Sequence, residues 1–234
     1  MVDMKNELEG KVAIVTGSAR NIGRATVEEL ARAGASVVVN SVQARDLCEK
    51  VAESINASGG KAIVAMADVR DPEQVDAMAN AATDAFGGID IVVHNAAVRS
   101  NQSFLDLNHE TFSHIIDLSI HGCFHLAKAT TPSMIERGGG NFIGVGGMTS
   151  LKGVKGRSHV MAAKMGLNAF IRGLALDLAA YNIRANQAVV GHYETVRDGN
   201  PSSASQRAAT DPGAPLGRKG VPQDMANLIR FLVG

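Results

Sequence analysis

One run near the amino terminus has the composition of a phosphate-binding turn: Thr16-Gly17-Ser18-Ala19-Arg20-Asn21-Ile22-Gly23. Gly17 and Gly23 allow backbone to approach a pyrophosphate closely, and a helix that begins here offers unpaired N–H groups and a favourable dipole. Asn21 stands where a third glycine is common, and asparagine tolerates a positive φ. A glycine turn can be purely structural, but this one lies at the first predicted strand-to-helix junction, which favours phosphate binding.

Several histidines could take part in proton or metal chemistry. His121 and His125 are four residues apart around Cys123, a spacing that can hold a metal on one helix face. No third ligand is evident, so we predict no metal and expect these side chains to pack or to lie on a helix surface. His94 and His192 lie near predicted strand ends and are candidate pocket residues. For both, the alternative is a hydrogen-bonded core histidine or a solvent-facing one.

Strands and helices alternate along the chain, which predicts a parallel sheet covered by helices on both faces. Gly34 and the pair Gly87-Gly88 follow helical stretches and are expected to end them. Strands are predicted at Val12–Thr16, Ser36–Asn40, Ala62–Ala65, Ile89–Val93 and Asn141–Val145, and helices at Ile22–Ala33, Pro72–Phe86 and Thr111–Arg137. The segment Val196–Gly220, rich in Ser, Pro, Gly and Ala, is predicted to be a long mobile loop and a candidate lid.

Composition is that of one globular domain spanning residues 1–234, with 45% hydrophobic and 20% charged residues. The formal net charge is zero, which gives no broad attraction to nucleic acid or to an anionic membrane. No apolar run approaches the roughly 20 residues of a membrane helix, and the first residues do not form a secretory signal. Two cysteines, Cys48 and Cys123, make no disulfide framework, so we expect a cytoplasmic protein.

From Leu8 to Leu232 the sequence resembles the short-chain dehydrogenase/reductase family. The resemblance rests on motifs in the family's order: Thr16–Gly23 for its glycine fingerprint, Asp68-Val69 beside the adenine, His94-Asn95-Ala96-Ala97 for its Asn-Asn-Ala-Gly strand end, Ile183-Arg184-Ala185-Asn186 with Gly191 and Thr195, and Pro215-Leu216-Gly217-Arg218. It implies a Rossmann-like, doubly wound α/β fold that binds NAD(P) and oxidises alcohols or reduces carbonyls.

The same resemblance implies a catalytic Tyr-x-x-x-Lys pair on one helix face, and here the pair is Val160 and Lys164. Gly147 stands at the place of the family's carbonyl-binding serine, and Ser119 at the place of the asparagine that holds a relay water. Hydride transfer to a carbonyl needs a proton donor and a group that stabilises the oxyanion. Of the four catalytic side chains only Lys164 is retained, and Ser119 is a weak candidate.

His159, next to Val160, is a candidate replacement acid, because histidine titrates closer to neutrality than tyrosine. One residue on a helix is a rotation of about 100°, however, which is expected to turn His159 away from the face of Lys164. Lys164 has a second reason to remain, since in the family it also binds the nicotinamide ribose; the alternative is a solvated helix lysine. Thr195 resembles the residue that contacts the carboxamide.

Cofactor choice depends on the end of the second strand, where an acidic residue would favour NAD. That place holds Ser41 after Asn40, and Arg20 and Arg45 could meet a 2′-phosphate, so NADP is favoured over NAD. Arg20 as an ordinary surface arginine is the competing interpretation. The predicted cofactor-binding residues are Gly17, Ser18, Arg20, Asn21, Ile22, Gly23, Ser41, Asp68, Val69, Asn95, Ala96, Lys164 and Thr195.

Two functions are consistent with the sequence. One is an NAD(P)-dependent oxidoreductase with altered proton chemistry; the other is a non-catalytic, dinucleotide-binding subunit that pairs with an active relative. The family associates through the helices expected around Thr111–Arg137 and Ser158–Tyr181, so a homo- or hetero-oligomer is expected. Family members usually continue beyond the position of Gly234 into a final strand. Either this sequence is incomplete or its sheet has an open edge that a partner could cover.

Overall fold

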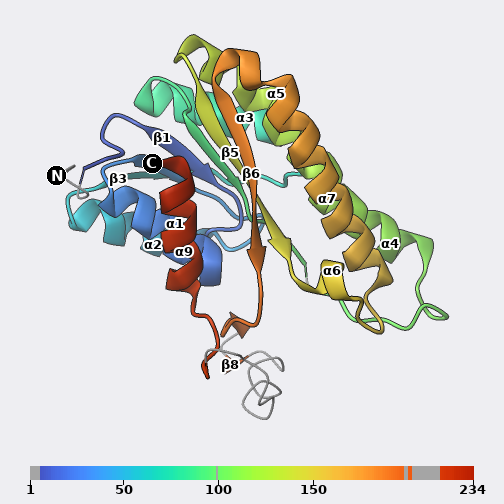
Figure 1. Ribbon diagram of the computed structural model, residues 1–234. Helices are drawn as coiled ribbons and strands as arrows, with labels where there is room; N and C mark the ends of the chain where they lie inside the picture. Colours follow the sequence, from blue (N-terminus) through green and yellow to red (C-terminus); the bar gives the residue numbers. More distant parts are fainter. Residues whose placement is uncertain (1–5, 99, 198–199, 202–216) are drawn as a thin grey trace.

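The computed structural model describes residues 6–98, 100–197, 200–201 and 217–234. Its centre is a six-stranded parallel sheet in the order β3-β2-β1-β4-β5-β6, with helices on both faces (Figure 1). The order reverses between β1 and β4, so the connections wind in both directions from this point. The strands are β1 Val12–Val15, β2 Ser36–Val39, β3 Lys61–Val64, β4 Ile91–His94, β5 Gly140–Gly147 and β6 Ile183–Val190.

The two faces of the sheet are packed by different helices. All four residues of β1 are buried, as expected of a strand covered on both sides. One hydrophobic cluster joins the sheet to α1 (Asn21–Arg32), α2 (Arg45–Ala57) and α9 (Pro222–Val233). The other joins it to α3 (Pro72–Phe86), α5 (Gly122–Glu136) and α7 (Ser158–Asp177). The predicted single-domain α/β fold with a doubly wound parallel sheet is therefore confirmed.

The helix predicted over Thr111–Arg137 is wrong as a single element. The structure has α4 (His109–Ile116), a π-helical turn at Asp117–His121, and α5. Helix α4 begins earlier than predicted because the Asn108 side chain accepts a hydrogen bond from Thr111 N and caps the first turn. The remaining short elements are α6 (Thr149–Lys152), a 3₁₀ turn at Ala179–Tyr181, and an antiparallel pair of β7 (Val196–Arg197) and β8 (Asn200–Pro201).

Several predicted boundaries are confirmed. Helix α3 runs from Pro72 to Phe86 as expected: Asp71 caps its first turn, and Gly87 ends it with a φ of 84°. The five predicted strands are present, with ends displaced by up to two residues. The lid predicted over Val196–Gly220 falls mostly on residues outside the described ranges. In the described residues β6 pairs with β5 alone, and no helix is long and apolar enough to cross a membrane.

Candidate functional site

The glycine turn lies between β1 and α1 at the carboxyl end of the sheet, beside the point where the strand order reverses. Gly17 has a φ of 63° and Asn21 a φ of 53°, so asparagine adopts the positive φ expected from the sequence. A Cβ on Gly23 would lie 2.3 Å from the Gly17 carbonyl oxygen. Arg20 is the N-cap residue of α1, and its side chain makes no capping hydrogen bond to the first turn. The backbone N–H groups of that turn are therefore suited to receive an anion.

Asn95, which follows β4, and Thr16, which follows β1, hold this turn in place. The Asn95 side-chain amide donates to the carbonyls of Thr16 and Gly17, at 3.0 and 3.1 Å. The Thr16 hydroxyl accepts from the backbone N–H groups of Asn95 and Ala96, both at 3.1 Å. The contribution of Asn95 to a dinucleotide site is therefore to fix the shape of the turn, and Ala96 is held beside it.

Asn40 ties the turn to the carboxyl ends of β2 and β3, a role that the sequence analysis missed. Its side-chain oxygen accepts from Gly17 N at 3.3 Å, and its amide donates to the carbonyls of Ala65 and Ala67 at 2.9 and 3.2 Å. The Ser18 hydroxyl, fully buried, accepts from Asn40 N at 2.9 Å. The Ser18 backbone N–H also donates to the Asn40 carbonyl, at 2.8 Å, so both the hydroxyl and the N–H of Ser18 are used inside the protein. The one sequence signal was a polar residue at the end of an apolar strand.

The other predicted cofactor residues differ in their surroundings. Arg20 is exposed, whereas Ile22 is buried in the core. Ser41 is partly exposed, and its hydroxyl accepts from Ala44 N at 3.3 Å. Thr195 is 7% exposed.

At the predicted adenine position, Arg70 binds both oxygens of the Asp68 carboxylate. This hydrogen bonding by Arg70 holds the pKa of Asp68 below its usual value. Val69 is buried, and its carbonyl accepts from His125 Nδ1 at 3.0 Å. A Cβ added to Gly122 would lie 2.7 Å from a methyl carbon of the Val69 side chain, so Val69 packs closely against α5.

Lys164 projects from α7 to the carboxyl end of β5. Its ammonium group donates to the Val145 carbonyl at 2.8 Å. Burial lowers its pKa from 10.5 to about 8, and Cys123 acts weakly in the opposite direction. The lysine is therefore cationic at neutral pH, close to the range in which it exchanges a proton.

His94 and Ser119 form a buried contact beside Lys164. His94 Nε2 lies 3.2 Å from the Ser119 carbonyl, so Nε2 carries the proton and donates it. His94 Nδ1 is buried and has no hydrogen-bond partner. Burial and the Lys164 charge lower the pKa of His94 to about 3, which keeps the imidazole neutral. Ser119 lies in the π-helical turn, and its backbone rather than its hydroxyl makes this contact.

Val160, at the position of the family's catalytic tyrosine, is partly exposed, whereas its neighbour His159 is completely buried. His159 is one of the four buried residues of α7, with Ala163, Leu167 and Ile171. Neither of its ring nitrogens has a hydrogen-bond partner. Burial, with the nearby Arg157 charge, lowers the pKa of His159, so it is a poor proton donor at neutral pH.

Of the remaining predicted histidines, His121 and His125 have stacked rings with centroids 6.5 Å apart, but their ring nitrogens have different partners. His121 Nδ1 lies 2.7 Å from an Asp117 oxygen on the helix surface, and His125 is bound to the Val69 carbonyl. His192 is exposed just after β6. Within the part of the chain that the structure describes, no three His, Cys, Asp or Glu residues gather as a metal site.

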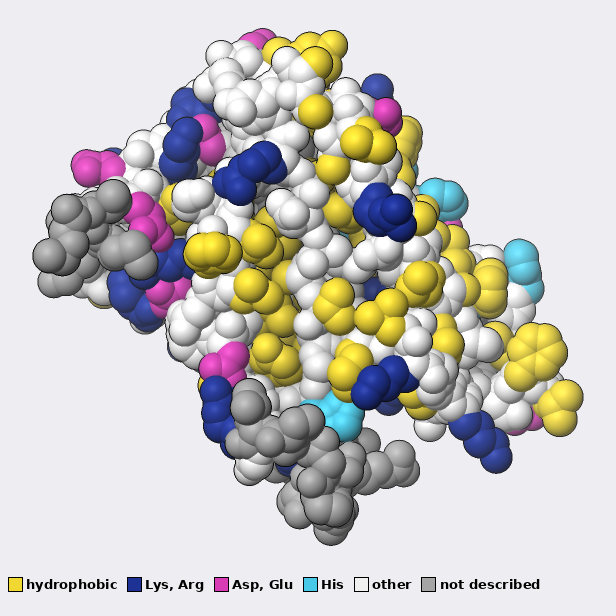
Figure 2. All heavy atoms as spheres, in the orientation of Figure 1, with side chains coloured by type: hydrophobic (Ala, Val, Ile, Leu, Met, Phe, Trp, Pro, Cys, Tyr) yellow, Lys and Arg dark blue, Asp and Glu magenta, His cyan; other side chains and the backbone are white. Residues whose placement is uncertain are grey.

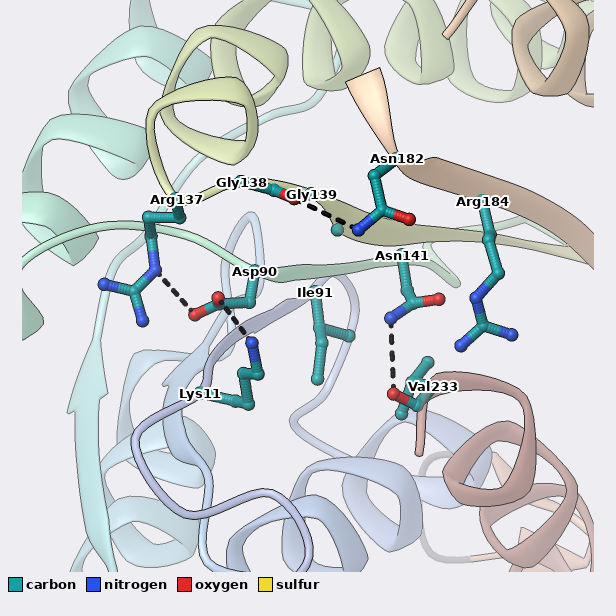
Figure 3. A pocket seen from close by; sticks show the side chains of 11 residues that line it. Lys11, Asp90, Ile91, Arg137, Gly138, Gly139, Asn141, Asn182, Arg184 and Val233 are labelled. Atoms are coloured by element: carbon teal, nitrogen blue, oxygen red, sulfur yellow. Dashed lines mark hydrogen bonds and ion pairs between the residues drawn. The ribbon is translucent and has the colours of Figure 1, made fainter. Parts of the chain in front are cut away.

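A polar depression lies at the opposite end of the sheet, at the amino ends of β1, β4, β5 and β6 (Figure 3). The buried Asp90 carboxylate binds Arg137 at 2.9 Å and Lys11 at 3.3 Å, and it accepts from Val12 N at 2.9 Å. Across the depression, Asn141 donates to the Val233 carbonyl. This cluster joins strand ends and is separate from the glycine turn, which is at the carboxyl ends of the strands.

Comparison with known proteins shows similarity to one enzyme family over nearly the whole chain. A family model described as enoyl-(acyl carrier protein) reductase matches residues 17–234. An L-rhamnose 1-dehydrogenase (NAD(P)(+)) of Azotobacter vinelandii is 35% identical over 227 residues, which are 95% of this chain and 89% of that protein. The chain belongs to the short-chain dehydrogenase/reductase family. A 3-oxoacyl-[acyl-carrier-protein] reductase of Vibrio cholerae is 34% identical over 226 residues, 96% of this chain and 90% of the relative.

Solved structures of short-chain dehydrogenases extend this similarity to three dimensions. A dehydrogenase/reductase from Sinorhizobium meliloti superimposes with a TM-score of 0.91 at 30% identity, covering 99% of this chain and 90% of that one. A short-chain dehydrogenase from Burkholderia cenocepacia in complex with NADP gives a TM-score of 0.90 at 30% identity, with coverage of 98% and 92%. By family, the protein is an NAD(P)-dependent oxidoreductase with a nicotinamide dinucleotide cofactor.

Proposed function

We propose that this chain binds NADP in preference to NAD and acts on a carbonyl or alcohol with proton chemistry that relies on Lys164. The observation that carries the proposal is the turn at Gly17–Gly23, in which Asn95 and the close approach of Gly23 to Gly17 leave room only for hydrogen. Such a turn at the start of an uncapped helix suits a pyrophosphate. A bound nicotinamide dinucleotide supplies or accepts the hydride.

The chain's own residues would hold the reactants and move the proton. Lys164 places a cation at the end of β5, where negative charge develops on a carbonyl oxygen during reduction. Val160 and Gly147 supply neither a proton nor a hydrogen bond through their side chains. Losing a general acid costs about 10²–10⁴ in rate, and losing one oxyanion donor costs about 10²–10³. Slow turnover is therefore expected.

The preference for NADP follows from charge at the end of β2. Ser41 brings no carboxylate to repel a 2′-phosphate, and Arg20 is exposed beside the turn. Arg45, at the start of α2, makes a 3.6 Å surface pair with Glu49, an interaction weak enough for a phosphate to displace. Two buried cysteines without a disulfide, Cys48 and Cys123, fit the reducing conditions of the cytoplasm.

The substrate class is a carbonyl or an alcohol. The relatives are named for the oxidation of a sugar hydroxyl and for the reduction of a 3-oxoacyl thioester. L-Rhamnose with NADP⁺ and acetoacetyl-coenzyme A with NADPH are therefore suitable first probes.

The test is calorimetric titration of the purified chain with NADPH and NADH, followed by turnover assays with both probes. We expect tighter binding of NADPH and slow turnover that is lost in Lys164→Met. The double variant Val160→Tyr, Gly147→Ser should be at least about tenfold faster, since it returns a phenol and a hydroxyl. Failure to bind either nucleotide would overturn the proposal.

A second function, a non-catalytic subunit of an active relative, is favoured by the surroundings of the two histidines that were considered as acids. His159 and His94 are both buried with depressed pKa values, so neither replaces the phenol as an acid. Exposed Phe124 on α5 and Leu176 on α7 give these helices apolar surface for a homo- or hetero-oligomer. Nucleotide binding without turnover, together with increased activity of an added relative, would support this function over the first.

A further inference from the structure

The end of β5 has an open space where the family's carbonyl-binding serine would begin. A Cβ built on Gly147 meets one heavy atom within 4 Å, the Thr149 hydroxyl oxygen at 3.8 Å. Neighbouring glycines of the same strand differ: a Cβ on Gly146 would come within 2.7 Å of Gln187, and one on Gly144 within 3.0 Å of Ile171. Among the described residues other than its two chain neighbours, the Thr149 hydroxyl oxygen is the atom that lies nearest to the space at Gly147.

Two hydroxyls follow Gly147, and they are used differently. Ser150 Oγ donates to the Gly147 carbonyl at 2.7 Å, so its hydrogen is engaged within the turn. Within the described residues, no hydrogen bond of the Thr149 hydroxyl is found, while the Thr149 backbone carbonyl accepts from Gly153 N at 3.2 Å. Thr149 is thus held by its backbone and keeps its side-chain donor available at the edge of the space.

The segment that carries Thr149 is anchored. Gly147 pairs with Val190 in the sheet, and Met148 N donates to the Val190 carbonyl at 2.8 Å. Lys164 binds the Val145 carbonyl two residues earlier on the same strand. The hydroxyl and the ammonium group are therefore both fixed to the carboxyl end of β5.

We propose that the Thr149 hydroxyl donates to the substrate carbonyl the hydrogen bond that Gly147 cannot supply; this rests on the proposed function. An oxygen atom placed in the space next to Gly147 can lie about 2.7 Å from a hydroxyl at its edge. A hydrogen bond to an oxyanion is stronger than one to a neutral carbonyl. This contact therefore stabilises the transition state of carbonyl reduction more than the ground state. Thr149 is then a catalytic residue in contact with substrate.

A dead-end complex tests this without turnover. Acetoacetyl-coenzyme A is titrated into the protein saturated with NADP⁺; both partners are oxidised, so no hydride can move. The variants are Thr149→Val, which keeps the side-chain shape, Thr149→Ser, which keeps the hydroxyl, Ser150→Ala as the matched control, and Thr149→Val with Gly147→Ser as the rescue. NADP⁺ binding and the thermal midpoint are measured for each protein.

We expect Thr149→Val to weaken binding of acetoacetyl-coenzyme A about 3–10-fold, the effect of one hydrogen bond. Thr149→Ser should bind within about twofold of wild type, and the added serine at position 147 should recover most of the loss. Ser150→Ala should not reproduce the Thr149→Val loss. Equal binding by wild type and Thr149→Val, or no binding of the thioester to the NADP⁺-loaded wild type, would overturn the assignment of Thr149. Failure of NADP⁺ itself to bind would instead overturn the proposed function and the assignment with it.

Discussion

Replacing Gly23 with alanine tests the geometry on which dinucleotide binding depends. The added methyl would lie 2.3 Å from the Gly17 carbonyl oxygen and 2.6 Å from the Asn95 amide nitrogen. Both contacts are far below a van der Waals distance, and one of the partners is backbone. The turn or Asn95 must therefore move.

The size of the effect follows from these contacts. Overpacking of this kind costs about 1–3 kcal/mol, and displacing Asn95 adds about 0.5–1.5 kcal/mol for a lost hydrogen bond to the turn. We expect the free energy of unfolding to fall by about 2–4 kcal/mol. In a domain of this size that lowers the thermal midpoint by about 4–16 °C. The affinity for NADPH should fall by about tenfold or more, because the displaced turn carries the proposed phosphate site.

Gly173 provides the matched control. It lies in α7, and a Cβ there meets nothing within 4 Å. Gly173→Ala adds the same methyl to a helix interior and should raise stability by about 0.5–1 kcal/mol without changing NADPH affinity. Urea denaturation and calorimetry measure both quantities. A Gly23→Ala protein with the stability and NADPH affinity of wild type would contradict the argument, because the turn would then have room for a methyl group.

Three further predictions concern charge. The Lys164 pKa of about 8 lies below its ordinary 10.5, so the unfolded chain binds more protons between these values. The stability of wild type relative to Lys164→Met should therefore rise from pH 8 to 10.5 in denaturation series; a constant difference would contradict the buried ammonium. Ser41→Asp keeps an acceptor for Ala44 N and should weaken NADPH more than NADH in calorimetry, with Ser41→Asn as the control; an unchanged ratio would remove Ser41 from cofactor choice. Asp90→Asn, which leaves the Arg137 charge largely unpaired, should cost about 2–4 kcal/mol of stability yet leave NADPH affinity unchanged, and loss of that affinity would contradict the separation of the two sheet ends.

Local signals in the sequence were enough to predict the strand–helix alternation and one helix completely. Helix α3 begins with a capping aspartate and a proline and ends at a glycine, so both of its boundaries are encoded by adjacent residues. The prediction of one regular helix over Thr111–Arg137 missed the π-helical turn at Asp117–His121, because that turn keeps the chain helical and no glycine or proline lies within it.

The contacts that shape the site join residues far apart in sequence. Asn40 reaches residues 17, 65 and 67, and Asn95 reaches residues 16 and 17. No periodicity or spacing records such contacts. Sequence spacing predicts that His159 turns from the Lys164 face, but it could not indicate that the imidazole is fully buried without a hydrogen-bond partner, since that depends on how α7 meets the rest of the fold.

The outer edge of β6 bears on how the protein behaves in concentrated solution. In the described residues this eight-residue strand has no second neighbour, contains no proline, and carries one charged residue, Arg184. Apolar side chains lie on the same face of the molecule (Figure 2). At its pI of about 7.1 the chain has no net charge to keep two copies apart. Any self-association through this edge would meet the least charge repulsion near neutral pH, and moving the pH away from 7.1 in either direction would oppose it.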